Sequence, residues 1–173
     1  MSKAFTREND DMEPEIPPAR AEVPKGGRRL MTADGAERLR SEAAALEEQR
    51  LRLEETSGTD ADARQELRRI NARRQAIADI LGRADVVANA EGPANELRFG
   101  LFVTIRHEDG AEDEYRLVGV DEVDPEGGSI SWLSPLAQAL MGGKVGDVVR
   151  FHAPVGEKIL QIVRIRSRAG DVV

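Results

Sequence analysis

The sequence contains no cysteine, two histidines and few aromatic residues, which make up 3% of the chain. The absence of cysteine excludes a disulfide framework, a thiol nucleophile and a cysteine-rich zinc site. His107 and His152 stand in separate segments, so a histidine-based metal centre is not expected either. The chain also lacks a nucleophile elbow, a dinucleotide fingerprint and a phosphate-binding loop. It therefore predicts a protein that is not an enzyme and needs no cofactor or metal.

Long apolar runs are missing as well. No stretch approaches the roughly 20 apolar residues that a membrane-spanning helix needs, and the opening residues MSKAFTREND lack the apolar core of a signal peptide. The net charge of −7 argues against strong direct binding of nucleic acid through bulk electrostatics. We therefore expect a cytoplasmic protein with no membrane partner, whose partner has a basic or mixed-charge surface.

The chain divides into three segments with different patterns. Residues 1–29 are rich in proline and charge, have no apolar periodicity and end near a Gly-Gly pair. Such a segment buries too little apolar surface to offset its ordering entropy, so it is predicted to be a disordered tail. A short motif that binds a partner is the alternative for this segment.

Residues 30–85 have the pattern of a helical hairpin. Two runs of residues recur at alternating spacings of three and four, the heptad pattern of paired helices, and Ser57-Gly58 between them signals a short turn. A turn this short makes the helices antiparallel. With roughly 22 residues per helix, the hairpin is a coiled-coil arm about 33 Å long. The positions of the two seams are Ala36, Leu39, Ala43, Leu46, Arg50 and Leu53, then Ala63, Leu67, Ile70, Arg74, Ile77, Leu81 and Ala84.

The ends of the two helices carry recognisable signals. Asp34 with Glu37 predicts a capping box at the start of the first helix. Thr59 or Asp60 can cap the second helix, and Gly82 can end it. These signals define a hairpin closed by a turn at its far end.

Two arginines interrupt the otherwise apolar seams. Antiparallel pairing about a turn at Gly58 places Arg50 near Glu66 and Arg74 near Glu42. Each arginine can lay its apolar stem along the seam and form an ion pair at the edge. Setting the register of the hairpin is the expected role, and direct contact with a partner is the alternative.

Residues 86–173 have the period of β-strands. The stretch LRFGLFVTIRH alternates apolar and polar residues, and Asp109-Gly110 offers a hairpin turn. Further strands are predicted in EYRLVGVD, GSISWLS, VVRFHAP and EKILQIVRIRS, and a short helix, PLAQALM, opens with Pro135. Five short strands with one short helix predict a compact α+β domain.

Two features of this chain could carry function. Carboxylates near the tip of the arm could complete the shell of a Mg²⁺ ion held by another macromolecule, although acids near a helix start also simply favour its dipole. Trp132, beside the short helix, is either a core residue or the anchor of an interface. The tip carboxylates are Glu54, Glu55, Asp60 and Asp62.

The stretch ISWLSPLAQALMGGKVGD, residues 130–147, resembles the GreA/GreB family of bacterial transcription elongation factors. LMTADGAERLRSE resembles the opening of that family's first helix, and ELRRINARRQAIADILGRADVV its second helix. The resemblance implies a helical hairpin followed by a small FKBP-like β-rich domain, over residues 30–167. It also implies that the C-terminal domain docks on bacterial RNA polymerase at the rim of the secondary channel. The docking residues would be Trp132, Leu133, Ser134, Pro135, Leu136 and Gln138.

The tip of the arm departs from the family pattern. Family members that promote transcript cleavage carry a tip of the type G-D-x-S-E-N, whereas this chain has SGTDADAR. The arm is also shorter, by two or three turns per helix, which withdraws its tip by roughly 10–16 Å. Catalytic positioning tolerates errors of about 1 Å. The chain therefore resembles a short-armed, Rnk-like variant of the family.

The function expected from these observations is modulation of transcription elongation or initiation without strong stimulation of transcript cleavage. Such a protein would compete with other secondary-channel factors for polymerase. The first alternative is an active Gre-type factor that stimulates cleavage of backtracked RNA. The second is a coiled-coil adaptor unrelated to polymerase, which would account for the arm but not for the pattern at residues 130–147.

Overall fold

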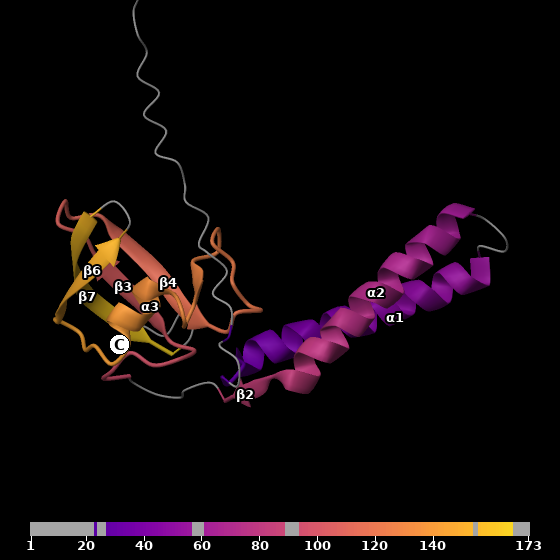
Figure 1. The fold of residues 1–173 in the computed structure, drawn as a ribbon, viewed down its shortest axis with the longest axis horizontal. Helices are drawn as coiled ribbons and strands as arrows, with labels where there is room; N and C mark the ends of the chain where they lie inside the picture. Colours follow the sequence, from indigo (N-terminus) through magenta and orange to yellow (C-terminus); the bar gives the residue numbers. More distant parts are fainter. Residues whose placement is uncertain (1–22, 24–26, 57–60, 89–93, 154–155, 168–173) are drawn as a thin grey trace, which may run out of the picture.

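A long helical arm projects from one side of a small β-rich domain (Figure 1), the α+β architecture expected from the sequence. The computed structural model describes residues 23, 27–56, 61–88, 94–153 and 156–167. Most of the predicted tail, the turn at the tip of the arm and Asp60 lie outside these residues. The division into a tail, an arm and a C-terminal domain at residues 29 and 85 stays a prediction.

The arm consists of two antiparallel helices, α1 (Ala33–Thr56) and α2 (Ala61–Arg83). With 24 and 23 residues, they are about 36 Å and 35 Å long. Seam positions are buried at both ends of the pair, as the heptad pattern predicts. The buried side chains are Ala36, Leu39, Ala63, Ile70 and Ile77.

The ends of these helices differ from the sequence prediction. The cap of α1 is Thr32, whose hydroxyl accepts a hydrogen bond from Gly35 N at 3.0 Å. The predicted cap, Asp34, instead forms an ion pair with Arg116 of the β-rich domain, at 2.7 Å. Gly82 lies inside α2, which continues to Arg83. The capping box was wrong because a tertiary contact, invisible in the local sequence, takes the side chain of Asp34.

The ion pairs along the arm also differ from those expected. Arg50 pairs within α1, with Glu47 at 2.8 Å and Glu54 at 2.6 Å, and not with Glu66 of the other helix. Arg74 does reach across the arm, but to Glu47 at 2.8 Å. Glu42, its expected partner, is bound by the neighbouring Arg73. The seam arginines therefore form ion pairs, as expected, but with other glutamates than the pairing about Gly58 predicted.

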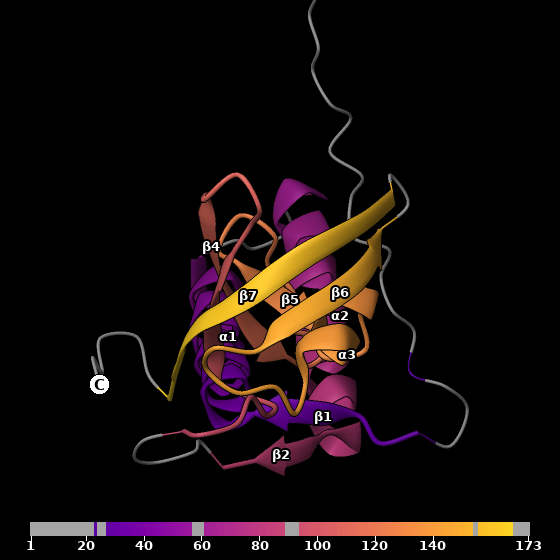
Figure 2. The same cartoon turned by 90° about the vertical axis from the view of Figure 1, so that its left-hand side faces the viewer.

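The base of the arm contains a small sheet that the sequence analysis missed. Strand β1 (Leu30–Thr32) enters α1, and β2 (Asp85–Val87) follows α2 almost directly, and the two strands pair in parallel. Three-residue strands carry too few residues for a period to be recognised. Their pairing joins the two ends of the hairpin where the arm meets the domain (Figure 2).

The β-rich domain contains the five strands and one helix predicted from the sequence. They are β3 (Phe102–Arg106), β4 (Glu112–Val118), β5 (Ser129–Ser131), α3 (Pro135–Leu140), β6 (Val148–Ala153) and β7 (Gly156–Arg166). The strand order is β5-β4-β3-β7-β6, antiparallel except for the β4–β5 pair. Figure 2 shows α3 lying against the end of the sheet that holds β6.

The core of this domain lies between α3 and one face of the sheet. Alternating residues of β3 are buried, as the period of two predicts, and β7 supplies the next row. The buried cluster consists of Leu97, Leu101, Val103, Ile105, Leu117, Ala137, Leu140, Leu160, Ile162 and Ile165. The domain therefore packs around one small apolar core of its own.

Two helical glycines give a matched pair of stability predictions. Gly82→Ala meets no heavy atom within 4 Å, so alanine should stabilise the protein by about 0.5 kcal/mol, the usual helix preference. Gly35→Ala places its Cβ 1.9 Å from Glu122 Oε1, so the same change should destabilise by about 1–3 kcal/mol. Urea unfolding of both variants checks the prediction. A stabilising Gly35→Ala would contradict the tight packing described here.

Candidate functional site

The loop before α3 forms a turn fixed by local hydrogen bonds. Ser134 is the helix cap, and its hydroxyl accepts a hydrogen bond from Ala137 N at 3.2 Å. Pro135 occupies the first turn, where no backbone donor is needed. Gln138 donates from its side chain to the carbonyl of Trp132 at 2.7 Å. The predicted docking residues therefore share one preformed turn.

Trp132 is a half-buried residue at this turn. Its ring meets Phe99 edge to face, with centroids 6.5 Å apart, and it belongs to neither buried cluster of the described residues. The indole Nε1 is buried and has no hydrogen-bond partner among the described residues. Trp132 thus lies at the margin of the domain, which leaves its interface role a prediction.

The other members of the turn differ in exposure. Pro135 and Gln138 are exposed, and Leu133 is half-buried. Leu136 is half-buried and packs against the main core. A polar replacement of Leu136 would therefore disturb the fold, and Trp132, Pro135 and Gln138 are the better probes of docking.

The tip carboxylates do not form a cluster in the part of the chain that the structure describes. Glu54 pairs with Arg50 at 2.6 Å, and Glu55 is exposed at the end of α1. Asp62 lies in the first turn of α2, where a negative charge favours the helix dipole. No group of three or more His, Asp or Glu side chains that could hold a metal ion occurs among the described residues. Asp60 lies outside the described residues.

Arginine partners shift the pKa of two carboxylates along the arm. The hydrogen bond from Arg73 lowers the pKa of Glu42 from its usual value of 4.5. The pKa of Glu47 is lowered chiefly by its hydrogen bond with Arg50, with a further contribution from the charge of Arg74. Both carboxylates are therefore more acidic in the folded arm than in the unfolded chain.

These shifts predict that acid destabilises the arm. A lowered pKa in the folded state contributes stability above the unfolded pKa, and this stability disappears as pH falls through the folded pKa. Glu42→Gln should lower the melting temperature by about 1–3 °C at neutral pH, an effect that vanishes at pH well below 4.5. Circular dichroism melts at several pH values measure it. Glu55→Gln, at an exposed position with no ion pair to another residue that the structure describes, is the control. Equal effects of both variants would contradict the assignment.

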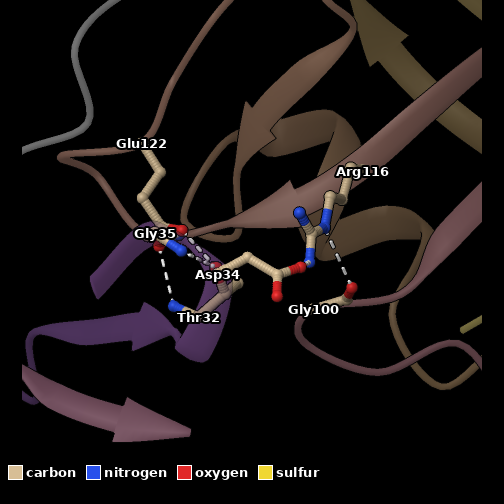
Figure 3. A network of polar contacts seen from close by, with 7 residues as sticks. Thr32, Asp34, Gly35, Gly100, Arg116 and Glu122 are labelled. Atoms are coloured by element: carbon tan, nitrogen blue, oxygen red, sulfur yellow. Dashed lines mark hydrogen bonds and ion pairs between the residues drawn. The ribbon is translucent and has the colours of Figure 1, made fainter. Parts of the chain in front are cut away.

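The junction between the arm and the domain is built around one buried carboxylate, that of Glu122 in the loop after β4. Its Oε2 accepts hydrogen bonds from Thr32 N at 2.9 Å and from Gly119 N at 3.0 Å. Its Oε1 accepts one from the hydroxyl of Thr32 (Figure 3). Three donors therefore hold a carboxylate that is almost wholly buried.

Two ion pairs also join the arm to the domain at this junction. Arg29 forms two hydrogen bonds with Asp121, at 2.7 Å and 2.5 Å, and the hydrogen bond with this carboxylate raises the pKa of the arginine. Arg116 holds Asp34 at 2.7 Å and the carbonyl of Gly100 at 3.2 Å (Figure 3). The arm is thus tied to the domain at three separate points.

The sequence analysis missed this junction. Thr32 and Glu122 are 90 residues apart, and a single acid in a loop gives no periodic or motif signal. Two glycines offered a hint, because Gly35 inside a predicted helix and Gly119 inside the predicted strand EYRLVGVD mark close approaches of the backbone.

Comparisons with known proteins agree with this architecture. Residues 92–167 match the family model described as "Transcription elongation factor, GreA/GreB, C-term". Over 167 residues the chain is 34% identical to transcription elongation factor GreB of Pseudomonas aeruginosa, a match that covers 86% of this chain and 94% of that protein. The chain belongs to the GreA/GreB family. This family member is also 33% identical over 151 residues to GreA of Halalkalibacterium halodurans, covering 79% of this chain and 95% of that protein.

Solved structures similar to this GreA/GreB family member include two with wide coverage. One is GreA factor homolog 1 of Thermus thermophilus, 27% identical, with 80% of this chain and 99% of that chain covered and a TM-score of 0.39. Another is the GreA/GreB elongation factor of Nitrosomonas europaea, 25% identical, with 80% and 98% covered and a TM-score of 0.39. None of the helices in the described ranges has the length and apolar character needed to cross a membrane.

Proposed function

We propose that this GreA/GreB family member binds bacterial RNA polymerase at the rim of the secondary channel and modulates transcription without strongly stimulating transcript cleavage. The observation that carries the proposal is family membership over nearly the whole length of a GreB factor, 94% of it. A cytoplasmic protein whose C-terminal domain docks and whose arm enters the channel is consistent with this membership. It would compete with other secondary-channel factors for the same rim.

The turn before α3 supports the docking half of the proposal. It presents an aromatic ring, a proline and an amide on a backbone already held by the cap of Ser134. A surface that needs no reordering loses less entropy on binding. Trp132 combines the size and partial exposure typical of residues that dominate binding energy at interfaces.

The tip of the arm supports the other half. Positioning a metal ion for cleavage requires carboxylates that converge within about 1 Å of their working geometry. Glu54 forms an ion pair with Arg50, and the described tip carboxylates form no cluster with metal-binding geometry. In this proposal the two helices, about 35 Å long, occupy the secondary channel without delivering metal-binding carboxylates to the polymerase active site.

A competition experiment tests the proposal. Fluorescently labelled protein is titrated with bacterial core polymerase, and an unlabelled, cleavage-competent GreB factor is then added. We expect saturable binding that excess GreB reverses, because both occupy one rim. Absence of binding would exclude the polymerase-directed function and favour a coiled-coil adaptor. Binding that GreB does not reverse would place the protein elsewhere on polymerase.

A further inference from the structure

Hydrogen bonds to one buried side chain connect the base of the arm to the β-rich domain. Glu122 is 5% exposed, and its carboxylate accepts hydrogen bonds from the backbone and hydroxyl of Thr32 and from the backbone of Gly119. Thr32 is also the cap of α1, because its hydroxyl accepts from Gly35 N. One side chain of the domain therefore holds both the last residue of β1 and the first turn of α1.

The backbone approaches this carboxylate and its loop closely at two glycines. A Cβ on Gly35 would lie 1.9 Å from Glu122 Oε1, and a Cβ on Gly119 would lie 2.1 Å from the carbonyl oxygen of Leu30. Real atoms do not approach so closely, so only glycine allows the arm and the loop to meet in this way. Rotation of the arm would break the hydrogen bonds and open the contact together.

The neighbouring ion pairs restrict the arm in further directions. Arg29 and Asp121 join the chain before β1 to the loop after β4, and both side chains are at most 30% exposed. Asp34 and Arg116 join the first turn of α1 to the face of β4. Together with the hydrogen bonds of Glu122, these pairs give three separate contacts between the arm and the domain, and Figure 3 shows two of them, Glu122 with Thr32 and Arg116 with Asp34.

We propose that Glu122 is a positioning residue that holds the arm at one angle to the docking domain. The inference rests on the proposed function, because the angle decides whether a docked protein directs its arm into the channel. In the proposed function docking uses the turn before α3, and among the described residues Glu122 forms its hydrogen bonds with Thr32 and Gly119, not with that turn. Loss of Glu122 should therefore separate binding to polymerase from the effect on transcription.

The first test measures the angle in the protein alone. The chain has no cysteine, so Arg68→Cys on α2 and Glu108→Cys on the β3–β4 turn, both exposed, accept a pair of spin labels without interference. We expect a narrow distance distribution in the labelled parent and a clearly broader one with Glu122→Ala. Glu122→Gln should restore most of the narrow distribution, because its amide oxygen can accept both backbone hydrogen bonds. Glu126→Ala, at an exposed position of the same loop, should change nothing.

An unchanged distribution in folded Glu122→Ala would overturn the proposal. Circular dichroism and melting establish that the variant is folded. If Glu122→Ala does not fold, Thr32→Val decides in its place, since it removes only the hydroxyl that donates to the carboxylate and caps α1. A narrow distribution in Thr32→Val would then overturn the proposal, and a broadened one would support it.

The second test uses core polymerase. Unlabelled Glu122→Ala should bind with an affinity close to that of the wild type, yet at saturation it should lose most of the wild-type effect on elongation rate. If Glu122→Ala lost its affinity for polymerase to the same extent as its effect on elongation rate, the proposed separation of docking from arm position would be overturned. A wild type that fails to bind polymerase would refute the proposed function, while the distance measurements would still decide whether Glu122 fixes the arm.

Discussion

Replacing Trp132 with alanine is expected to weaken binding to core RNA polymerase by about 30-fold or more. Loss of an interface anchor typically costs about 2 kcal/mol or more, which corresponds to this change in affinity. The domain should stay folded, because Trp132 is half-buried and lies outside both described core clusters. Titration of labelled protein with polymerase measures the change.

The control for this prediction is Val148→Ala. Val148 is 63% exposed on β6 and is not one of the predicted docking residues, so its truncation should leave affinity unchanged. Melting temperatures of both variants separate lost docking from lost stability. Wild-type affinity in a normally folded Trp132→Ala variant would remove Trp132 from the interface.

The second large effect concerns competition in transcript cleavage. A tenfold excess of this protein should slow GreB-stimulated cleavage of backtracked RNA by about tenfold if the two proteins bind equally well, as mass action requires. Replacing all four tip carboxylates by their amides should not diminish this suppression. The reason is that displacement depends on docking through the turn before α3, whereas the replaced residues are Glu54, Glu55, Asp60 and Asp62.

The Trp132→Ala variant serves as the matched control in this assay. It keeps the arm but should lose suppression in proportion to its lost affinity. Suppression that depends on the tip carboxylates and not on Trp132 would show that the arm, rather than the domain, holds the protein on polymerase.

Periodicity predicted most of this fold because each long element buries one face. The heptad seams gave both helices, and alternation gave β3 and β7, since a regular spacing of apolar residues follows directly from helix and strand geometry. The turn before α3 was also predictable, because Ser134-Pro135 is a local cap signal. Each of these features is determined by residues that lie close together in the sequence, so the sequence is enough to predict it.

The junction could not be predicted, because its contacts join distant segments. Asp34 has the sequence signature of a helix cap, yet Arg116, 82 residues away, takes its carboxylate and leaves the cap to Thr32. Arg50 and Arg74 were recognised as seam arginines, but Arg50 pairs with Glu47 and Glu54 of its own helix, and Arg74 pairs with Glu47. Local pattern identifies a polar residue in an unusual place; only the packed structure identifies its partner.

The most direct test of the central claim is the rate of RNA cleavage in purified backtracked elongation complexes saturated with the wild-type protein. Occupancy is established in the same samples by the fluorescence of the labelled protein. The account predicts that cleavage remains at the intrinsic rate of the complexes, although the protein is bound. Cleavage accelerated by orders of magnitude, and lost when the four tip carboxylates become amides, would contradict it and establish an active cleavage factor.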